Sequence, residues 1–91
     1  PPMELDFVKN IQFTKLIKVD GRLKEFNFRK PNSKQDGSFT VDVMDELGAR
    51  IIFNMEKKES NWCITNPQLP VWVLESEHAF QEIIDKEFKF D

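Results

Sequence analysis

Apolar and polar side chains alternate along two long stretches in the first two thirds of the chain, a period of two that is typical of half-buried β-strands. In the first stretch, residues 11–29, apolar residues such as Phe13 and Phe26 stand among Lys, Thr and Glu, and Asp20-Gly21 interrupts the pattern at its middle. An Asp-Gly pair is typical of a tight turn between two antiparallel strands. Residues 11–29 therefore predict a β-hairpin.

The turn of this hairpin is compatible with two registers. A two-residue loop at Asp20-Gly21 sets Val19 opposite Arg22. A three-residue loop that ends at Gly21 sets Ile17 opposite Leu23, and this choice matches the side chains better. Because a shift of one residue sends every side chain to the other face, the register decides which residues are buried. The sequence favours the three-residue loop.

Residues 38–56 give the clearest local pattern in the chain and predict a second hairpin. Glu46-Leu47-Gly48 suits a three-residue loop, with Gly48 in the left-handed region of φ, where a Cβ atom would be strained. This loop fixes the opposed pairs as Val43 with Ile51, Val41 with Phe53, and Phe39 with Met55. The alternation leaves one strongly apolar face, which has to be covered.

The C-terminal third changes from a period of two to a helical period. A polar turn leads into a short strand at residues 62–64, and prolines at positions 67 and 70 then break the chain. From Pro70 to about Phe88, apolar residues recur every three or four positions, which predicts one amphipathic helix with Pro70 in its first turn. Residues 3–10 fit either a strand or a helical turn, and residues 29–37 predict a polar loop.

This order of elements predicts one α+β domain over residues 1–91. Four or five antiparallel strands within residues 11–64 form a meander sheet, and the helix of residues 70–88 packs on one face of it. A small curved barrel capped by the helix is the alternative. One helix covers about three strands, so a five-stranded sheet would keep some apolar surface uncovered. That surface is the physical reason to expect self-association or a protein partner.

The composition holds few of the groups that catalysis requires. The chain has nine Phe and two Trp, but no Tyr, one His, one Cys and three Gly. A base beside a nucleophile, a set of metal ligands or a glycine-rich phosphate loop can hardly be assembled from these residues. Glu75 and His78 lie on one helix face at a spacing that metal sites use, but Glu82 is the simpler partner for His78. The sequence therefore predicts no enzymatic activity, no cofactor and no metal.

Other reactive groups are expected to be structural. Cys63 lies in a predicted strand and is interpreted as a small, partly buried residue rather than a reactive thiol. Most carboxylates sit at turns or on the polar helix face. Asp42 alone stands in the middle of a strand, and all are expected to be solvated. A single cysteine excludes an internal disulfide and is typical of a reducing compartment, which predicts a cytoplasmic location. An excised domain of an exported chain fits the sequence as well, and no apolar stretch of about 20 residues is present to span a bilayer.

Charge is unevenly distributed along the chain. The net charge of −3 disfavours a general polyanion-binding protein. Residues 1–34 hold eight basic and four acidic residues, a sum of +4, whereas residues 35–91 hold five basic and twelve acidic residues, a sum of −7. The two parts therefore attract each other, within one molecule or between two.

Three functions agree with these observations. The first is an interaction or structural module that self-associates through exposed sheet surface or a sheet edge. The second is a single-stranded nucleic-acid-binding module, because the first hairpin interleaves cations with aromatic rings. The third is a small-ligand or lipid-headgroup pocket between sheet and helix, lined by Phe39, Phe53, Trp72 and Phe80. Candidate nucleic-acid contacts are Lys15, Lys18, Arg22, Lys24, Arg29 and Lys30. Candidate interface or pocket residues are Phe13, Phe26, Phe28, Trp62 and Trp72.

Overall fold

The computed structural model of the chain describes residues 11–30, 37–66 and 68–87. The ambiguous lead-in at residues 3–10 and most of the predicted polar loop lie outside the described residues. Along the described chain the elements follow in the order β1 (Ile11–Val19), β2 (Arg22–Lys30), β3 (Ser38–Met44), β4 (Arg50–Lys58), β5 (Asn61–Ile64), α1 (Val71–Leu74) and α2 (Glu77–Glu87).

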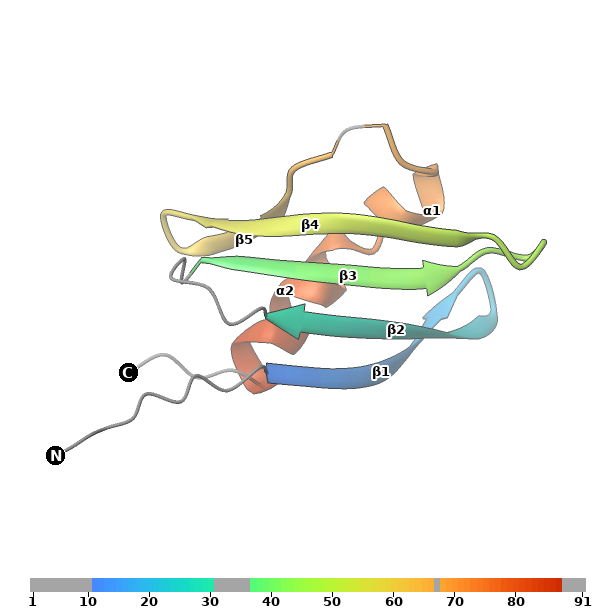
Figure 1. Cartoon of the computed structure of the whole chain (residues 1–91), viewed down its shortest axis with the longest axis horizontal. Coiled ribbons are helices and arrows are strands. Elements are labelled where there is room, and N and C mark those ends of the chain that lie inside the picture. The colour runs from blue at the N-terminus through green and yellow to red at the C-terminus, as the bar shows by residue number, and fades with distance from the viewer. Residues whose placement is uncertain (1–10, 31–36, 67, 88–91) are drawn as a thin grey trace, which may run out of the picture.

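The five strands form one sheet in which each strand pairs antiparallel with the next along the chain (Figure 1). The sheet curls into a half-barrel, and both helices lie behind it in the view of Figure 1. The predicted α+β fold, an antiparallel meander followed by a C-terminal helix, is confirmed. The curl also agrees with the barrel alternative.

The register of the first hairpin differs from the favoured one. Val19 pairs with Arg22, and the turn residues Asp20 and Gly21 both have positive φ, 52° and 80°. This two-residue turn has a twist that matches the twist of the strands. The three-residue loop is therefore wrong. It would have directed Phe26 and Phe28 to the outside, whereas the observed register buries both rings and exposes only Leu23, so more apolar area leaves water.

The second hairpin has the predicted register. Val43 pairs with Ile51, and the two pairs that follow along the ladder are also as expected. Gly48 has φ of 85°, as the three-residue loop requires. Asp45 holds this loop closed, because its Oδ1 accepts hydrogen bonds from the backbone N–H groups of Leu47 at 2.9 Å and Ala49 at 2.8 Å.

The predicted single helix is divided into α1 and α2. Between them, the N–H of Ser76 bonds to the C=O of Val73 at 3.0 Å, a tighter turn than that of an α-helix, and the Ser76 hydroxyl donates to the C=O of Trp72 at 3.0 Å. Serine competes for backbone groups in this way and weakens helix interiors. Pro70 precedes the first turn as the N-cap of α1, with φ of −57° and ψ of 147°, rather than standing inside that turn. The predicted end at Phe88 lies outside the described residues.

Helix α2 crosses the sheet from one edge to the other. At its start, Glu77 Oε2 accepts a hydrogen bond from the N–H of Ile64 on β5 at 2.8 Å. At its end, Glu87 Oε2 lies 2.6 Å from Nζ of Lys15 on β1. The helix therefore reaches from β5 to β1 and spans more strands than the sequence predicted.

Phe80 of α2 is the centre of the core between helix and sheet. Its ring centroid lies 5.1 Å from that of Phe26, 5.5 Å from that of Phe53 and 6.0 Å from that of Phe28. All four rings are at most 2% exposed. The helix stripe also buries Val73 and Ile84. The face of the sheet that faces α2 is thus closed by aromatic packing.

Candidate functional site

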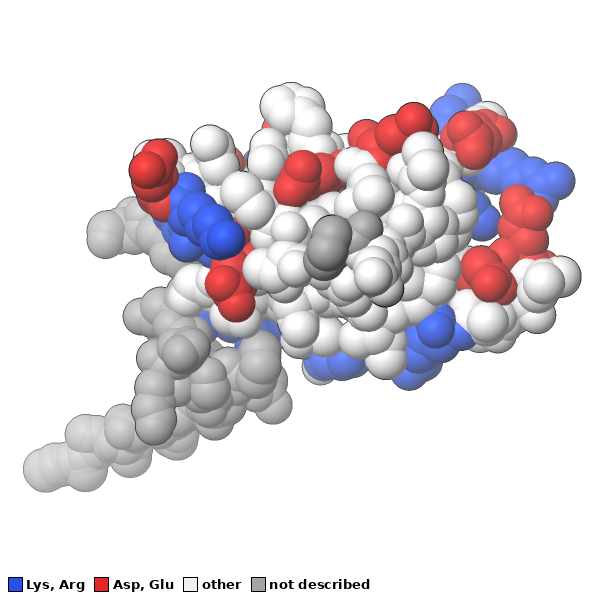
Figure 2. Space-filling view, turned by 90° about the horizontal axis from the view of Figure 1, so that it is seen from above, with Lys and Arg blue, Asp and Glu red and all other residues white. Residues whose placement is uncertain are grey.

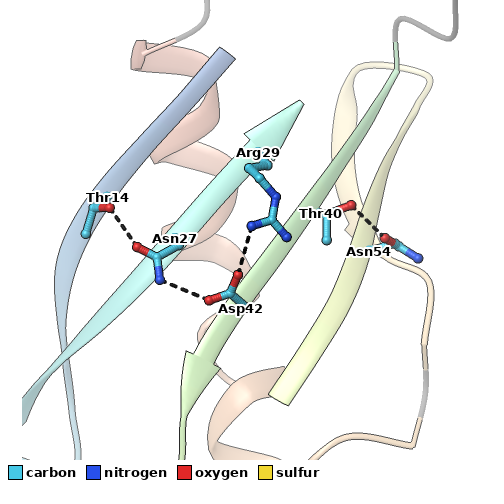
Figure 3. A network of polar contacts seen from close by, with 6 residues as sticks. All are labelled: Thr14, Asn27, Arg29, Thr40, Asp42 and Asn54. Atoms are coloured by element: carbon cyan, nitrogen blue, oxygen red, sulfur yellow. Dashed lines mark hydrogen bonds and ion pairs between the residues drawn. The ribbon is translucent and has the colours of Figure 1, made fainter. Parts of the chain in front are cut away.

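The opposite face of the sheet, which no described helix covers, is called the outer face below. One half of it is polar and bonds to itself (Figure 3). Thr14 Oγ1 donates to Asn27 Oδ1 at 2.7 Å, and Asn27 Nδ2 donates to Asp42 Oδ1 at 2.9 Å. A second pair joins Thr40 Oγ1 to Asn54 Oδ1 at 3.2 Å. This half of the outer face therefore meets much of its own hydrogen-bonding requirement.

Asp42 is the central acceptor of this polar half. Its side chain is 4% exposed, and its Oδ2 lies 3.4 Å from Nη1 of Arg29 on the neighbouring strand. The expectation that all carboxylates are solvated is therefore wrong for Asp42. Its neighbours on β2 shield the carboxylate and supply the donors that a buried anion needs.

The other half of the outer face carries exposed apolar side chains among charged ones. Four large side chains on four adjacent strands are each more than half exposed, and these are Leu16 (63%), Leu23 (63%), Met44 (54%) and Ile52 (52%). The registers place Leu16 diagonally beside Leu23, two residues from its partner Glu25, and Met44 diagonally beside Ile52, two residues from its partner Asp42. Leu23 and Met44 line one hollow. These four residues are called the exposed apolar patch.

A hollow adjoins the exposed apolar patch and is lined by two of the four patch residues together with polar and charged side chains. Its volume is about 350 Å³, and it is lined by Leu23, Lys24, Glu25, Asn27, Asp42, Met44 and Arg50. Glu25 and Arg50 are both exposed and lie on either side of Met44, one strand away in each direction. Neither of them makes an ion pair with another described residue. The hollow therefore holds one carboxylate and one guanidinium that have no ion-pair partner among the described residues.

Three of the six candidate nucleic-acid contacts lie on the helix-facing side of the sheet or are buried. Lys15 is paired with Glu87, and Nζ of Lys24 lies 4.9 Å from the ring centroid of Trp72. Lys30 is 8% exposed. These ammonium groups are held by the protein itself, so little of their charge is directed to an outside polyanion.

The other three candidate cations are scattered. Lys18 is exposed on the outer face of β1. Arg22, at the hairpin end, lies 3.8 Å from Glu46, and Arg29 is the cation beside Asp42. Each of the three ion pairs that these cations and Lys15 form joins the basic N-terminal part of the chain to its acidic remainder. The attraction between the two parts is thus present within one molecule.

The candidate interface or pocket aromatics are part of the core. Phe26, Phe28 and Trp62 are fully buried, and Phe13 and Trp72 are partly buried against them. Phe13 stacks on Phe28 at a centroid distance of 5.0 Å. The rings predicted to line a ligand pocket, Phe39, Phe53, Trp72 and Phe80, belong to the same packed layer.

The remaining candidate chemistry is on the surface. His78 is 80% exposed and its Nε2 lies 3.1 Å from Oε2 of Glu82, the partner that the sequence predicted. Cys63 is half-buried, with its Sγ 3.9 Å from the C=O of Asn61. In the part of the chain that the structure describes, no three His, Cys, Asp or Glu side chains come together as metal ligands. Within the same ranges, neither helix has the length and apolar character needed to cross a bilayer.

The side of the molecule that carries α1 offers a second, smaller apolar surface. Figure 2 looks down on this side and shows a mostly uncharged middle between two charged ends. Val71 and Leu74 of α1 are 65% and 37% exposed. These two residues belong to one short helix, whereas the exposed apolar patch extends over four strands, so the patch is the stronger candidate site.

Comparison of the chain with protein-family models, with curated proteins and with solved structures gave no match. The candidate site is therefore identified from the geometry of the structure alone. Sequence reasoning expected uncovered surface next to the helix and missed the outer face. The signal was present as adjacent apolar pairs, Leu16-Ile17 and Ile51-Ile52. In a strand, one member of such a pair has to point away from the core.

Proposed function

We propose that this chain is a non-enzymatic interaction module that self-associates through its exposed apolar patch. The observation that supports the proposal is that Leu16, Leu23, Met44 and Ile52 are all more than half exposed on the same face of four neighbouring strands. Isolated exposed apolar side chains are normal on protein surfaces, whereas a contiguous patch is typical of an interface.

The size of the patch predicts a weak dimer. With strands about 4.8 Å apart and same-face residues about 6.8 Å apart along a strand, the patch and its margins cover roughly 400–500 Å² on each copy. Two copies would bury about 800–1,000 Å² in total, near the lower limit for specific association. We therefore expect a dissociation constant between about 1 µM and 1 mM.

The outer face is a better candidate than the free edge of β1. Lys15 and Lys18 lie on that edge strand, and lysines on edge strands oppose pairing with another strand. The nucleic-acid alternative has less support, because its cations are divided between both sides of the sheet and most of them have partners in the chain. The pocket alternative has less support because its rings are packed against one another.

The test is the oligomeric state of the full chain, measured by sedimentation equilibrium from about 10 µM to 1 mM. The wild type should show a monomer–dimer equilibrium, and the double variant Leu23→Ser, Met44→Ser should be monomeric. Val71→Ser is the matched control, because it removes an equally exposed apolar side chain from α1 and should leave the dimer intact. A wild type that stays monomeric over the whole range would overturn the proposal.

A further inference from the structure

One row of residues crosses the exposed apolar patch with alternating character. Leu16 on β1 is opposite Glu25 on β2, and Met44 on β3 is opposite Arg50 on β4. Asn27 with Asp42 is the last pair that β2 makes with β3, and beyond it Glu25, Met44 and Arg50 line one hollow. The row is therefore apolar, acidic, apolar and basic across four strands. Met44 has Glu25 on its β2 side across the hollow and Arg50 directly opposite on β4.

We infer that two copies pack outer face to outer face about a two-fold axis that runs along β3 at Met44, so that Glu25 of each copy faces Arg50 of the other. This inference rests on the proposed self-association. A rotation of 180° about an axis along β3 places β2 of one copy over β4 of the other, while Met44 faces Met44. Each contact in such a dimer occurs twice, because a two-fold interface repeats every pair.

Charge distinguishes an axis along β3 from one that runs across the strands. An axis that runs across the strands, along the row, would place Glu25 over Glu25 and Arg50 over Arg50. Like charges opposed in this way disfavour a complex, and opposite charges favour one. Because neither Glu25 nor Arg50 forms an ion pair within the described part of its own chain, both remain available for the second copy. The axis along β3 is the arrangement that pairs them.

The same axis places the Met44 side chains of the two copies against each other. Aligned sheets pack with their strands within about 30° of each other, so residues of one row stay close to the same row of the second copy. Ile52 on β4 then comes over Asn27 on β2 of the second copy, because both residues lie in the row of Asp42.

Charge exchange tests this geometry. Glu25→Arg and Arg50→Glu should each weaken the homodimer about tenfold or more, because each replaces two attractive contacts by two repulsive ones. The double variant Glu25→Arg, Arg50→Glu should recover dimer formation. An equimolar mixture of the two single variants should form a heterodimer, since the arginine introduced at position 25 then faces the glutamate introduced at position 50. Glu56→Arg, an exposed residue at the far end of β4, is the control for altered net charge.

Cross-linking gives a second, independent measurement. In a Cys63→Ser background, Met44→Cys should form a disulfide-linked dimer on mild oxidation, because only a residue on the axis meets its own copy. Ile52→Cys, one strand away, should cross-link much less. The axis is wrong if the charge variants have no effect, or if Ile52→Cys cross-links better than Met44→Cys. The self-association still stands in that case, provided that the wild type dimerises and the double variant Leu23→Ser, Met44→Ser does not. A wild type that stays monomeric would contradict both the axis and the self-association.

Discussion

Phe80 is the residue whose loss should cost the fold most, and the expected size follows from its surroundings. It is fully buried, and three other buried rings lie with their centroids 5.1 to 6.0 Å away. Phe80→Ala removes a whole aromatic side chain and leaves a cavity that packed rings on a sheet can only partly close. Substitutions of this kind lower the free energy of unfolding by about 3–5 kcal/mol.

That loss is large compared with the total stability of the chain. A protein of 91 residues has a free energy of unfolding of roughly 5–14 kcal/mol. Phe80→Ala would therefore leave a marginal fold, and Phe80→Leu is the safer variant because it keeps most of the volume. The leucine variant loses the ring–ring interactions, each worth about 0.5–1.5 kcal/mol, so we expect a loss of about 1–3 kcal/mol.

Urea unfolding, followed by tryptophan fluorescence at a few micromolar protein, measures both variants. With an m-value of about 1.5 kcal/mol/M, Phe80→Ala should lower the midpoint by roughly 2–3 M and Phe80→Leu by roughly 1–2 M, with m unchanged. Leu16→Ala is the control, because Leu16 is 63% exposed and its loss should change stability by no more than about 0.5 kcal/mol. A loss below about 1 kcal/mol for Phe80→Ala would show that α2 does not close the core.

Three further predictions concern the polar half, the first turn and the helix end. Asp42→Ala should lower the free energy of unfolding by about 1–3 kcal/mol, because Asn27 loses its acceptor; urea midpoints that match the wild type would contradict this. Gly21→Val should cost about 1–2 kcal/mol through backbone strain at φ of 80°, since the space around it is open, and calorimetry should show a lower Tm. Lys15→Met should cost at most about 1 kcal/mol in low salt, because the Lys15–Glu87 pair is more than a third exposed, and the difference should vanish near 1 M NaCl.

The second hairpin could be predicted from sequence because its signals agree. Alternation places Phe39, Val41 and Val43 of β3 and most of the large residues of β4 on one face, and Gly48 fixes the loop length. When pattern and turn chemistry point to one register, few alternatives compete. The class of the fold and the order of its strands followed from the same agreement along most of the chain.

The first hairpin could not be predicted as securely, because two of its signals conflict. Cross-strand matching near the turn favoured a loop that would bury Leu23, and the Asp20-Gly21 pair favoured the two-residue turn. The deciding quantity was non-local, namely the burial of Phe26 and Phe28 beneath α2. The observed register buries two phenylalanine rings, whereas the three-residue loop would bury one leucine in their place. Counting the buried apolar side chains over the whole hairpin would have selected the observed register.

The break between α1 and α2 and the number of strands that α2 crosses could not be predicted from the helical periodicity of the sequence. The stripe of apolar positions continues through Ser76, so periodicity alone predicts one helix. The break reflects the hydroxyl of Ser76, which bonds back to Trp72. The direction of α2 is set at its two ends by the contact of Glu77 with Ile64 on β5 and that of Glu87 with Lys15 on β1, contacts that join residues far apart in sequence.

The packed core and the surface proposed for association lie on opposite faces of the same sheet, and this separation makes the proposed function testable. Phe80 and the rings around it stabilise the monomer from the helix side. Leu16, Leu23, Met44 and Ile52 are already more than half exposed in the monomer, so replacing them removes little buried area. The proposed self-association gives these outward apolar positions a role that the folded monomer does not require. A patch variant that keeps the wild-type urea midpoint but loses the dimer would demonstrate that role, because the lost interaction is then between molecules and not within one.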